Sequence, residues 1–145
     1  MRIYFICTGN TCRSPMAAAI LKSRNLPGVE VKSAGIYAMP GQPMSANAQA
    51  ALQKHHIDHD HISQPVNIEE LQSSHLILTM TGGHKEALLQ VYPQMADKTF
   101  TLKEYVLDKD EDVIDPFGGD LDTYLTTFEE LNNLIDVLEK KLLEE

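Results

Sequence analysis

The segment CTGNTCRS, residues 7–14, places a cysteine, an arginine and a serine at a spacing that suits phosphoryl transfer. Cys7 ends an apolar run and can act as a nucleophile in its thiolate form. Five residues separate it from Arg13, whose planar guanidinium can donate two parallel hydrogen bonds to phosphate oxygens. Ser14 adds a hydroxyl that can hydrogen-bond the thiolate. We therefore interpret Cys7 as a nucleophile and Arg13 as the group that binds the transferred phosphate.

The residues between Cys7 and Arg13 can form the anion-binding part of such a site. A tight loop between a strand and a helix directs consecutive backbone N–H groups inward, and the helix dipole adds positive potential. Gly9 and Asn10 tolerate the positive φ that a tight loop requires. The residues expected to bind phosphate are Thr8, Gly9, Asn10, Thr11, Cys12 and Ser14. A plainer interpretation stays open, in which Cys7 packs at a strand end and Arg13 is a surface charge.

Apolar runs and helix signals predict the elements that position this loop. Strands are expected over residues 2–7, 29–33, 76–80 and 98–102. Helices are expected from 14 to about 25, with Ser14 as the N-cap, over 45–52 and 83–91, and after the acidic loop 108–120. Strands alternating with helices predict a single α/β domain over residues 1–145, with a parallel sheet covered on both faces. Such sheets bind ligands at the carboxyl ends of their strands, where Cys7 lies.

Composition and charge exclude several classes of function. The chain has 145 residues, of which 43% are hydrophobic, a formal net charge of −9 and a pI of about 5.0. This acidity, without a basic stripe, argues against nucleic acid as a partner. No apolar run approaches the roughly 18 residues of a membrane span, and no cleavage pattern follows residues 3–7. We expect a cytoplasmic protein without membrane contact. Two cysteines are too few for a disulfide scaffold or a structural zinc site.

Two motifs in the chain resemble those of a known family. The segments ICTGNTCRSP at 6–15 and DPFGG at 115–119 are similar to motifs of the low-molecular-weight protein phosphatases, as is SAG at 33–35. The resemblance covers nearly the whole chain. It implies a four-stranded parallel sheet flanked by helices and hydrolysis through a phosphocysteine intermediate on Cys7. We expect neither a cofactor nor a metal ion to take part.

Asp115 is the expected proton donor. Cleavage of a bond from phosphorus to oxygen or nitrogen requires a proton for the leaving group, which Arg13 cannot give up. Asp115 precedes a proline and is followed by an aromatic residue and two glycines. The resemblance implies that it acts as the general acid for cleavage, and then as the base that positions water to release Cys7. The alternative is a turn-forming Asp-Pro pair, and the acids within 108–112 are expected to form a solvated charged loop.

Four histidines and two aspartates lie within residues 55–61, in the sequence HHIDHDH. Their spacing fits neither a helical nor a paired zinc-ligand pattern, so an exposed polar loop is favoured over a metal site. The resemblance implies a separate role for His61. It would belong, with Asn10, Ser14 and Ser33, to a hydrogen-bonded set that supports the phosphate-binding loop. His75, before the third strand, indicates no role from the sequence.

Cys12 lies in the same loop as Cys7. The resemblance implies that Cys12 can trap oxidised Cys7 as a reversible disulfide and so prevent its irreversible over-oxidation. The alternative is that Cys12 is a small residue that packs within the loop.

Thr11 bears on the choice of substrate. Many family members that act on phosphotyrosine carry Ile or Leu here, whereas Thr11, together with FTLKEYV at 100–106, resembles the bacterial protein arginine phosphatases. Threonine offers less apolar contact to a phenyl ring and adds a hydroxyl that can accept a hydrogen bond from a guanidinium. We expect hydrolysis of phosphoarginine in phosphorylated proteins, with phosphotyrosine as the alternative. Phe117 would form one wall of the site and stack on either leaving group.

Other classes of protein are weighed against this interpretation. The Walker sequence of nucleotide hydrolases is absent. Thioredoxin-coupled arsenate reductases share the loop but need a further pair of cysteines, and no cysteine follows Cys12. A phosphate-binding or redox-sensing protein without catalysis could dispense with Asp115, which is present. We expect the protein to act as a monomer.

Overall fold

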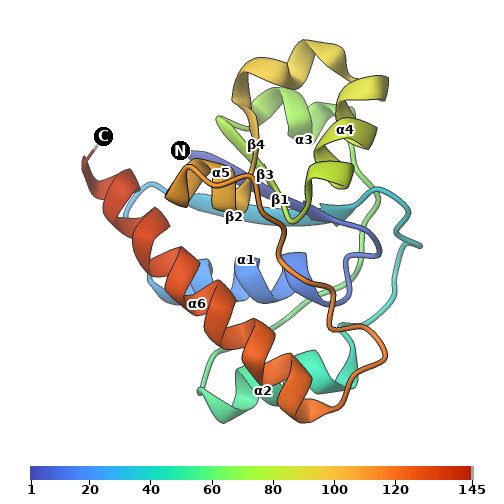
Figure 1. Cartoon of the computed structure of the whole chain (residues 1–145), viewed down its shortest axis with the longest axis vertical. Coiled ribbons are helices and arrows are strands. Elements are labelled where there is room, and N and C mark those ends of the chain that lie inside the picture. Colours follow the sequence, from blue (N-terminus) through green and yellow to red (C-terminus); the bar gives the residue numbers. More distant parts are fainter. Residues whose placement is uncertain (145) are drawn as a thin grey trace.

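The computed structural model describes residues 1–144, which form a parallel sheet between two layers of helices (Figure 1). The strands are β1 (Arg2–Cys7), β2 (Glu30–Gly35), β3 (Leu76–Thr79) and β4 (Thr99–Thr101). The helices are α1 (Arg13–Ser23), α2 (Ala46–Lys54), α3 (Ile68–Ser73), α4 (Gly82–Val91), α5 (Leu102–Leu107) and α6 (Leu121–Glu144), with the 3₁₀-helix η1 (Pro93–Lys98). The predicted four-stranded parallel α/β fold is confirmed.

The sheet has the strand order β2-β1-β3-β4, and all of its pairings are parallel. At the end of β1, Cys7 lies opposite Gly35 of β2, and Ile6 lies opposite Thr79 of β3. The chain leaves β1 for β2 on one side and later returns to β3 on the other. The carboxyl end of β1 is therefore the topological switch point, where open α/β sheets bind ligands.

Helices cover both faces of the sheet, as predicted (Figure 1). Alternate side chains of a strand point to opposite faces. Ile3 and Phe5 of β1 join a core with α1, α2, α5 and α6, whereas Tyr4 and Ile6 join a second core with α3, α4 and η1. All of β1 after Arg2 is buried, which suits an interior strand covered on both sides.

Helix α6 closes the core and leads directly out of the loop that carries Asp115. Its buried residues recur at helical spacing and are Tyr124, Thr127, Phe128, Leu131, Leu134, Ile135 and Leu138. α6 also contacts α1 through polar groups: the Arg24 guanidinium at the end of α1 donates to Asp136 and Glu139 of α6 at 2.7 and 2.9 Å. These contacts hold α6 against α1, which begins in the phosphate-binding loop.

The predicted N-cap of α1 is wrong. The helix begins at Arg13 with Cys12 at the N-cap position, and no side chain caps it. The hydroxyl of Ser14 contacts Cys7 instead, with 2.8 Å between Oγ and Sγ. A serine that precedes a proline is a common N-cap, but here its side chain is used by the site.

Three short elements were not predicted, namely α3, η1 and α5. Each spans six residues, which is too short to show an apolar period. β2 also continues to Gly35, past its predicted end at Ser33, because it pairs with β1 as far as Cys7. His75, for which the sequence indicated no role, accepts a hydrogen bond from the Arg2 N–H at 2.9 Å and links the starts of β3 and β1.

Candidate active site

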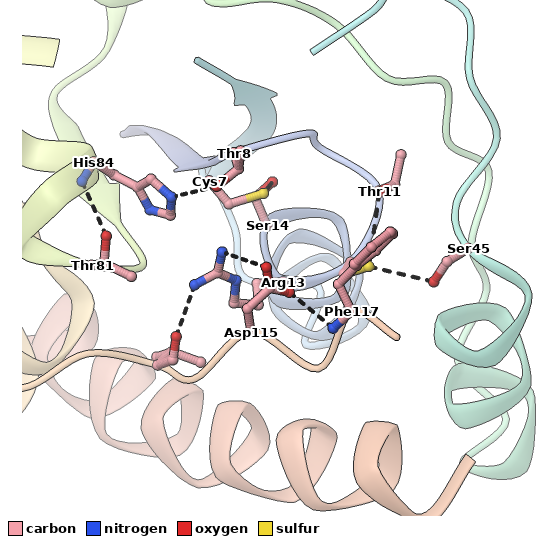
Figure 2. Close-up of polar contacts among 12 residues, drawn as sticks. Cys7, Thr8, Thr11, Arg13, Ser14, Ser45, Thr81, His84, Asp115 and Phe117 are labelled. Carbon is pink, nitrogen blue, oxygen red and sulfur yellow. Dashed lines mark hydrogen bonds and ion pairs between the residues drawn. The ribbon is translucent and has the colours of Figure 1, made fainter. Parts of the chain in front are cut away.

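A cavity of about 250 Å³ lies at the carboxyl end of β1 (Figure 2). Two segments line it, the phosphate loop (residues 7–14) and the acid loop (residues 108–120). Its lining residues are Cys7, Thr8, Gly9, Thr11, Cys12, Arg13, Asp115 and Phe117. Each of these is a site residue predicted from the sequence, and the fold brings them to one place. Of the other predicted site residues, Asn10 and Ser14 belong to the phosphate loop without lining the cavity, and Ser33 and His61 contact the loop through Asn10.

Cys7 lines the cavity with only 3% of its surface exposed. Its Sγ lies 2.8 Å from Ser14 Oγ, which also accepts a hydrogen bond from Asn10 Nδ2 at 2.9 Å. The hydroxyl proton of Ser14 is thus available to a second acceptor, and the alternative acceptor, the Ala34 carbonyl, is farther away at 3.4 Å. Ser14 can therefore donate to Cys7, and such a bond stabilises a thiolate.

Asn10 ties the phosphate loop to the segments behind it. It is fully buried and adopts a left-handed conformation, with φ of 58°. Its Nδ2 donates to Ser14 Oγ and Ser33 Oγ, both at 2.9 Å, and its Oδ1 accepts from the Gln64 N–H at 2.9 Å. Its carbonyl oxygen lies 2.6 Å from His61 Nε2. These bonds satisfy the buried amide and fix the curl of the loop.

His61 supports the loop in its neutral form. A carbonyl oxygen only accepts, so Nε2 must carry the hydrogen that bonds to Asn10. Burial lowers the pKa of His61 below 6.5, the bond to Asn10 opposes this shift, and the charge of Lys22 adds to it. A neutral ring with its hydrogen on Nε2 both donates to the Asn10 carbonyl and avoids placing a charge in a partly buried position.

Gly35 leaves the space that the phosphate loop occupies. A Cβ built there would lie 2.5 Å from Thr8 O and 2.8 Å from Asn10 N. The backbone atoms of the phosphate loop cannot move aside without disrupting the loop, so this position requires glycine. The sequence shows Gly35 within the SAG segment but does not reveal this steric role. Within residues 7–14 Asn10 alone has a positive φ, so the loop uses the tolerance expected of Asn10 and not that of Gly9.

Arg13 connects the phosphate loop to the acid loop. The residue is 4% exposed, and its Nη1 donates to the Val113 carbonyl at 2.9 Å. Its Nη2 lies 3.5 Å from Asp115 Oδ2, and its Nε is buried without a hydrogen-bond partner among residues 1–144. The edge formed by Nε and Nη2 is thus the part of the guanidinium that can donate two parallel bonds to a phosphoryl group.

Asp115 and Phe117 stand at the mouth of the cavity (Figure 2). The side chain of Asp115 is 49% exposed, and Phe117 is 80% exposed. Oδ1 of Asp115 accepts from the Phe117 N–H at 3.0 Å, while Oδ2 faces Arg13. The Asp-Pro turn of the alternative interpretation is therefore present, and it directs Oδ2 of Asp115 toward Arg13, which lines the cavity.

The acid loop is attached to the fold on either side of Asp115. Val113 is fully buried, and its N–H donates to the Met80 carbonyl at 2.9 Å. Asp112 Oδ1 accepts from the Gly82 N–H at 2.8 Å. On the far side, Asn47 Nδ2 of α2 donates to the carbonyl of residue 119 at 3.3 Å. Residues 108–112 are exposed, as predicted, and the carboxylate of Asp112 in addition accepts this bond from α4.

His84 of α4 is a residue of the site that the sequence did not reveal. Its Nε2 lies 2.8 Å from Thr8 Oγ1, and its Nδ1 is buried without a partner in the described chain. Burial, followed by the positive charge of Arg13, lowers the pKa of His84 from 6.5 to about 4, against opposing effects of Asp112 and Asp115. The contact joins residues 76 positions apart, and no local pattern announces it.

Cys12 is held by groups outside the phosphate loop. Its Sγ lies 3.3 Å from Tyr124 Oη and 3.5 Å from Ser45 Oγ. Burial, and then the bond with Cys12, raises the pKa of Tyr124, which keeps the phenol protonated. Cys7 and Cys12 are both free thiols in this structure.

The histidine-rich segment 55–61 follows α2 as a largely exposed turn and loop. His55 stacks on Phe128 with 4.1 Å between ring centroids, and His61 is engaged with the phosphate loop. Within residues 1–144 no three His, Cys, Asp or Glu side chains are grouped so that they could hold a metal ion. No helix in the same range combines the length and apolar character needed to cross a membrane.

The sequence matches a known family along nearly its entire length. The description of that family is low molecular weight phosphotyrosine protein phosphatase, and the match covers residues 2–145. The chain belongs to this family. A protein-arginine-phosphatase of Geobacillus stearothermophilus is 48% identical over 141 residues, which cover 97% of this chain and 95% of the relative.

Solved structures of the family share the fold at high similarity. One is a variant of the YwlE arginine phosphatase whose active-site cysteine is replaced by a phosphorylated serine; it has a TM-score of 0.98 and 44% identity, over 100% of this chain and 97% of that one. Another is a low molecular weight protein tyrosine phosphatase from T. tengcongensis, with a TM-score of 0.92 and 46% identity, over 97% of this chain and 99% of that one. An arginine phosphatase and a tyrosine phosphatase thus both share this fold.

Proposed function

We propose that this phosphatase hydrolyses phosphoarginine residues in phosphorylated proteins. The observation that carries the proposal is that Thr11 lines the same cavity as Cys7, Arg13 and Asp115. Its hydroxyl can accept a hydrogen bond from a guanidinium, and its small side chain offers little apolar surface to a phenyl ring. The similarity to a protein-arginine-phosphatase supports this choice.

In the first step, the Cys7 thiolate attacks phosphorus, and an S–P bond forms as the P–N bond breaks. The leaving guanidine nitrogen takes a proton from Asp115, which is left as a carboxylate. The free edge of Arg13 and the backbone N–H groups of the phosphate loop bind the three phosphoryl oxygens, where negative charge accumulates. Ser14 stabilises Cys7 as a thiolate before the attack.

In the second step, the Asp115 carboxylate takes a proton from water, and the water oxygen attacks phosphorus of the phosphocysteine. The S–P bond breaks, inorganic phosphate leaves, and Cys7 returns as a thiolate. The cycle ends with Asp115 protonated again and requires no cofactor. One chain supplies the nucleophile Cys7, the phosphate-binding Arg13 and the general acid Asp115, and we propose a monomer as the working unit.

The test is the ratio of kcat/KM for a phosphoarginine peptide to that for its phosphotyrosine counterpart. We expect the wild type to prefer phosphoarginine and Thr11→Ile to reverse the preference, because isoleucine removes the acceptor and adds apolar surface. Thr11→Val and Thr11→Ser are matched controls: valine replaces the hydroxyl with a methyl group at nearly the same size, and serine retains the hydroxyl without the methyl group. The reversal should follow the loss of the hydroxyl and grow with added apolar surface.

Two outcomes would contradict the proposed substrate. A preference for phosphotyrosine in both wild type and Thr11→Ile would make the protein a tyrosine phosphatase with the same Cys7 chemistry. The absence of turnover with either peptide, with phosphate still bound, would indicate a phosphate-binding protein without catalysis.

We also propose that Cys12 protects Cys7 from over-oxidation. A peroxide would oxidise the Cys7 thiolate to a sulfenic acid, and the Cys12 thiol would then displace hydroxide, giving a disulfide and water. The bonds to Tyr124 and Ser45 hold the Cys12 thiol within the site. Mild peroxide followed by peptide mass mapping should reveal a link between Cys7 and Cys12. Detection of sulfinic acid at Cys7 without any disulfide to Cys12 would contradict the proposal.

A further inference from the structure

The first turn of α4 contacts both loops that form the active site. The Gly82 N–H donates to Asp112 Oδ1 of the acid loop at 2.8 Å. His84 Nε2 lies 2.8 Å from Thr8 Oγ1 of the phosphate loop (Figure 2). Thr81 Oγ1 accepts from the His84 N–H at 3.0 Å and caps this turn. A single capped turn thus joins the loop that carries the nucleophile to the loop that carries the general acid.

We propose that His84 and Asp112 are positioning residues, which together set the place of Asp115 relative to Cys7. The proposal rests on the phosphatase function proposed above. In this proposal the first turn of α4, with its bonds to Asp112 and Thr8, forms a bracket that connects two loops distant in the sequence.

Asp115 needs such positioning because it has little support of its own. Half of its side chain is exposed, one oxygen bonds to Phe117 within the same loop, and the other lies 3.5 Å from Arg13. Asp112 is three residues earlier in the chain and is bound to α4. The buried Val113 attaches the acid loop to the core at one point. The bond between Asp112 and α4 attaches it at a second point, so the loop cannot turn freely about Val113.

His84 acts on the phosphate loop as a neutral ring. Its Nδ1 is buried without a partner among residues 1–144, and a hydrogen placed there would be a buried, unpaired donor. The tautomer with its hydrogen on Nε2 avoids this, and it donates to Thr8 Oγ1. The hydroxyl hydrogen of Thr8 is then free to point into the cavity, which Thr8 lines. His84 therefore both holds the bracket and makes Thr8 a donor to a phosphoryl oxygen.

The test measures kcat/KM for a series of aryl phosphates whose phenols differ in acidity. This parameter reports on formation of the phosphocysteine, and only poor leaving groups need the proton of Asp115 in that step. We expect Asp112→Ala to lower kcat/KM about tenfold for the least acidic phenols and less than about twofold for the most acidic. His84→Ala should show the same dependence with a raised KM in addition, because Thr8 loses its orientation.

Conservative variants separate positioning from folding. Asp112→Asn keeps an acceptor for the Gly82 N–H, and His84→Gln keeps a donor within reach of Thr8. Both should stay within about twofold of the wild type across the series. Asp110→Ala removes an exposed carboxylate from the same loop and serves as the control for charge. Thermal unfolding of each variant shows whether it is folded at the assay temperature.

The double variant His84→Ala/Asp112→Ala tests whether the two residues act through one connection. Either single change opens the bracket, so the double change should add little leaving-group dependence to that of the larger single effect. Multiplicative effects would overturn the proposal, as would equal losses for every phenol or a failure of the conservative variants to restore activity. If the wild type hydrolyses none of these esters, the phosphatase function itself fails, and this outcome is distinguishable from all the others.

Discussion

The phosphate loop and the acid loop meet at Arg13 but are built in opposite ways. Most of the phosphate loop is buried, with Cys7, Asn10 and Ser14 between 0% and 3% exposed, and Ser33, His61 and Gln64 bond to it from other segments. The acid loop is attached on either side of Asp115, while the tip itself stands in solvent. Groups that stabilise charge in a transition state act best when they are fixed in advance. A proton donor must instead meet leaving groups of various shapes and later a water molecule, and an exposed position permits both.

The largest expected effect is at the buried nucleophile. Cys7→Ser should lower multiple turnover by about 10⁴-fold or more, because a serine hydroxyl is a weak nucleophile and a phosphoserine is not readily hydrolysed. The phosphorylated serine in the YwlE variant supports this expectation. Intact mass spectrometry after incubation with substrate should detect a single stable phosphate on Ser at this position. Sustained release of phosphate by the purified variant would contradict the role of Cys7.

The second effect concerns the exposed loop. Asp115→Asn should slow attack by about 10²–10⁴-fold for poor leaving groups and much less for acidic phenols, because only the former require a proton. The free energy of unfolding should change little, since the side chain is half exposed. The measurement is kcat/KM across a series of phenols, with urea unfolding beside it. Equal slowing across the series would count against an acid role for Asp115.

The third effect is a loss of fold stability when the space behind the phosphate loop is filled. Gly35→Ala places a Cβ 2.5 Å from Thr8 O and should destabilise the fold by about 1–3 kcal/mol, because the phosphate loop cannot move aside. Gly9→Ala is the matched control, since its Cβ would meet Thr11 Oγ1 at an ordinary 3.7 Å. Urea unfolding of the two variants provides the comparison. Similar stabilities for both would show that the loop has room that the structure does not indicate.

The smallest effect is a pH dependence of stability. Burial lowers the pKa of His61 and brings that of His84 to about 4 from 6.5, so the unfolded chain binds more protons in this window. The contribution of the two neutral histidines to the free energy of unfolding is complete above about pH 6.5 and is lost as the pH falls toward 4. Stability should therefore decrease from pH 7 to pH 5, and His61→Gln should reduce that slope.

The control for the loss of one histidine is His56→Asn, at an exposed position where asparagine tolerates the observed φ of 56°. Urea unfolding at several pH values measures the slope in each variant. A slope that is the same in the wild type and in His61→Gln would show that His61 does not contribute to it.

The sequence by itself determined the first strand and the position of the phosphate loop, and it predicted the chemistry of residues 7–14. These features are contiguous, so the strand pattern, the loop residues and the start of the helix are all visible within about two dozen letters. The long helix α6 was also predicted, because its apolar residues recur over many turns. Asp115 was predicted as the proton donor from its motif, which is local as well.

Only the tertiary structure decided what connects these pieces. Arg13 bonds to Val113 across 100 positions, His84 meets Thr8 across 76, and Gly82 meets Asp112 across 30. The need for Gly35 likewise arises from a backbone that packs against it from another segment. Local patterns record the propensity of a chain to form strands, loops and helices. Contacts between loops depend on how those elements are placed around a shared sheet, and a single sequence does not encode that placement in any short stretch.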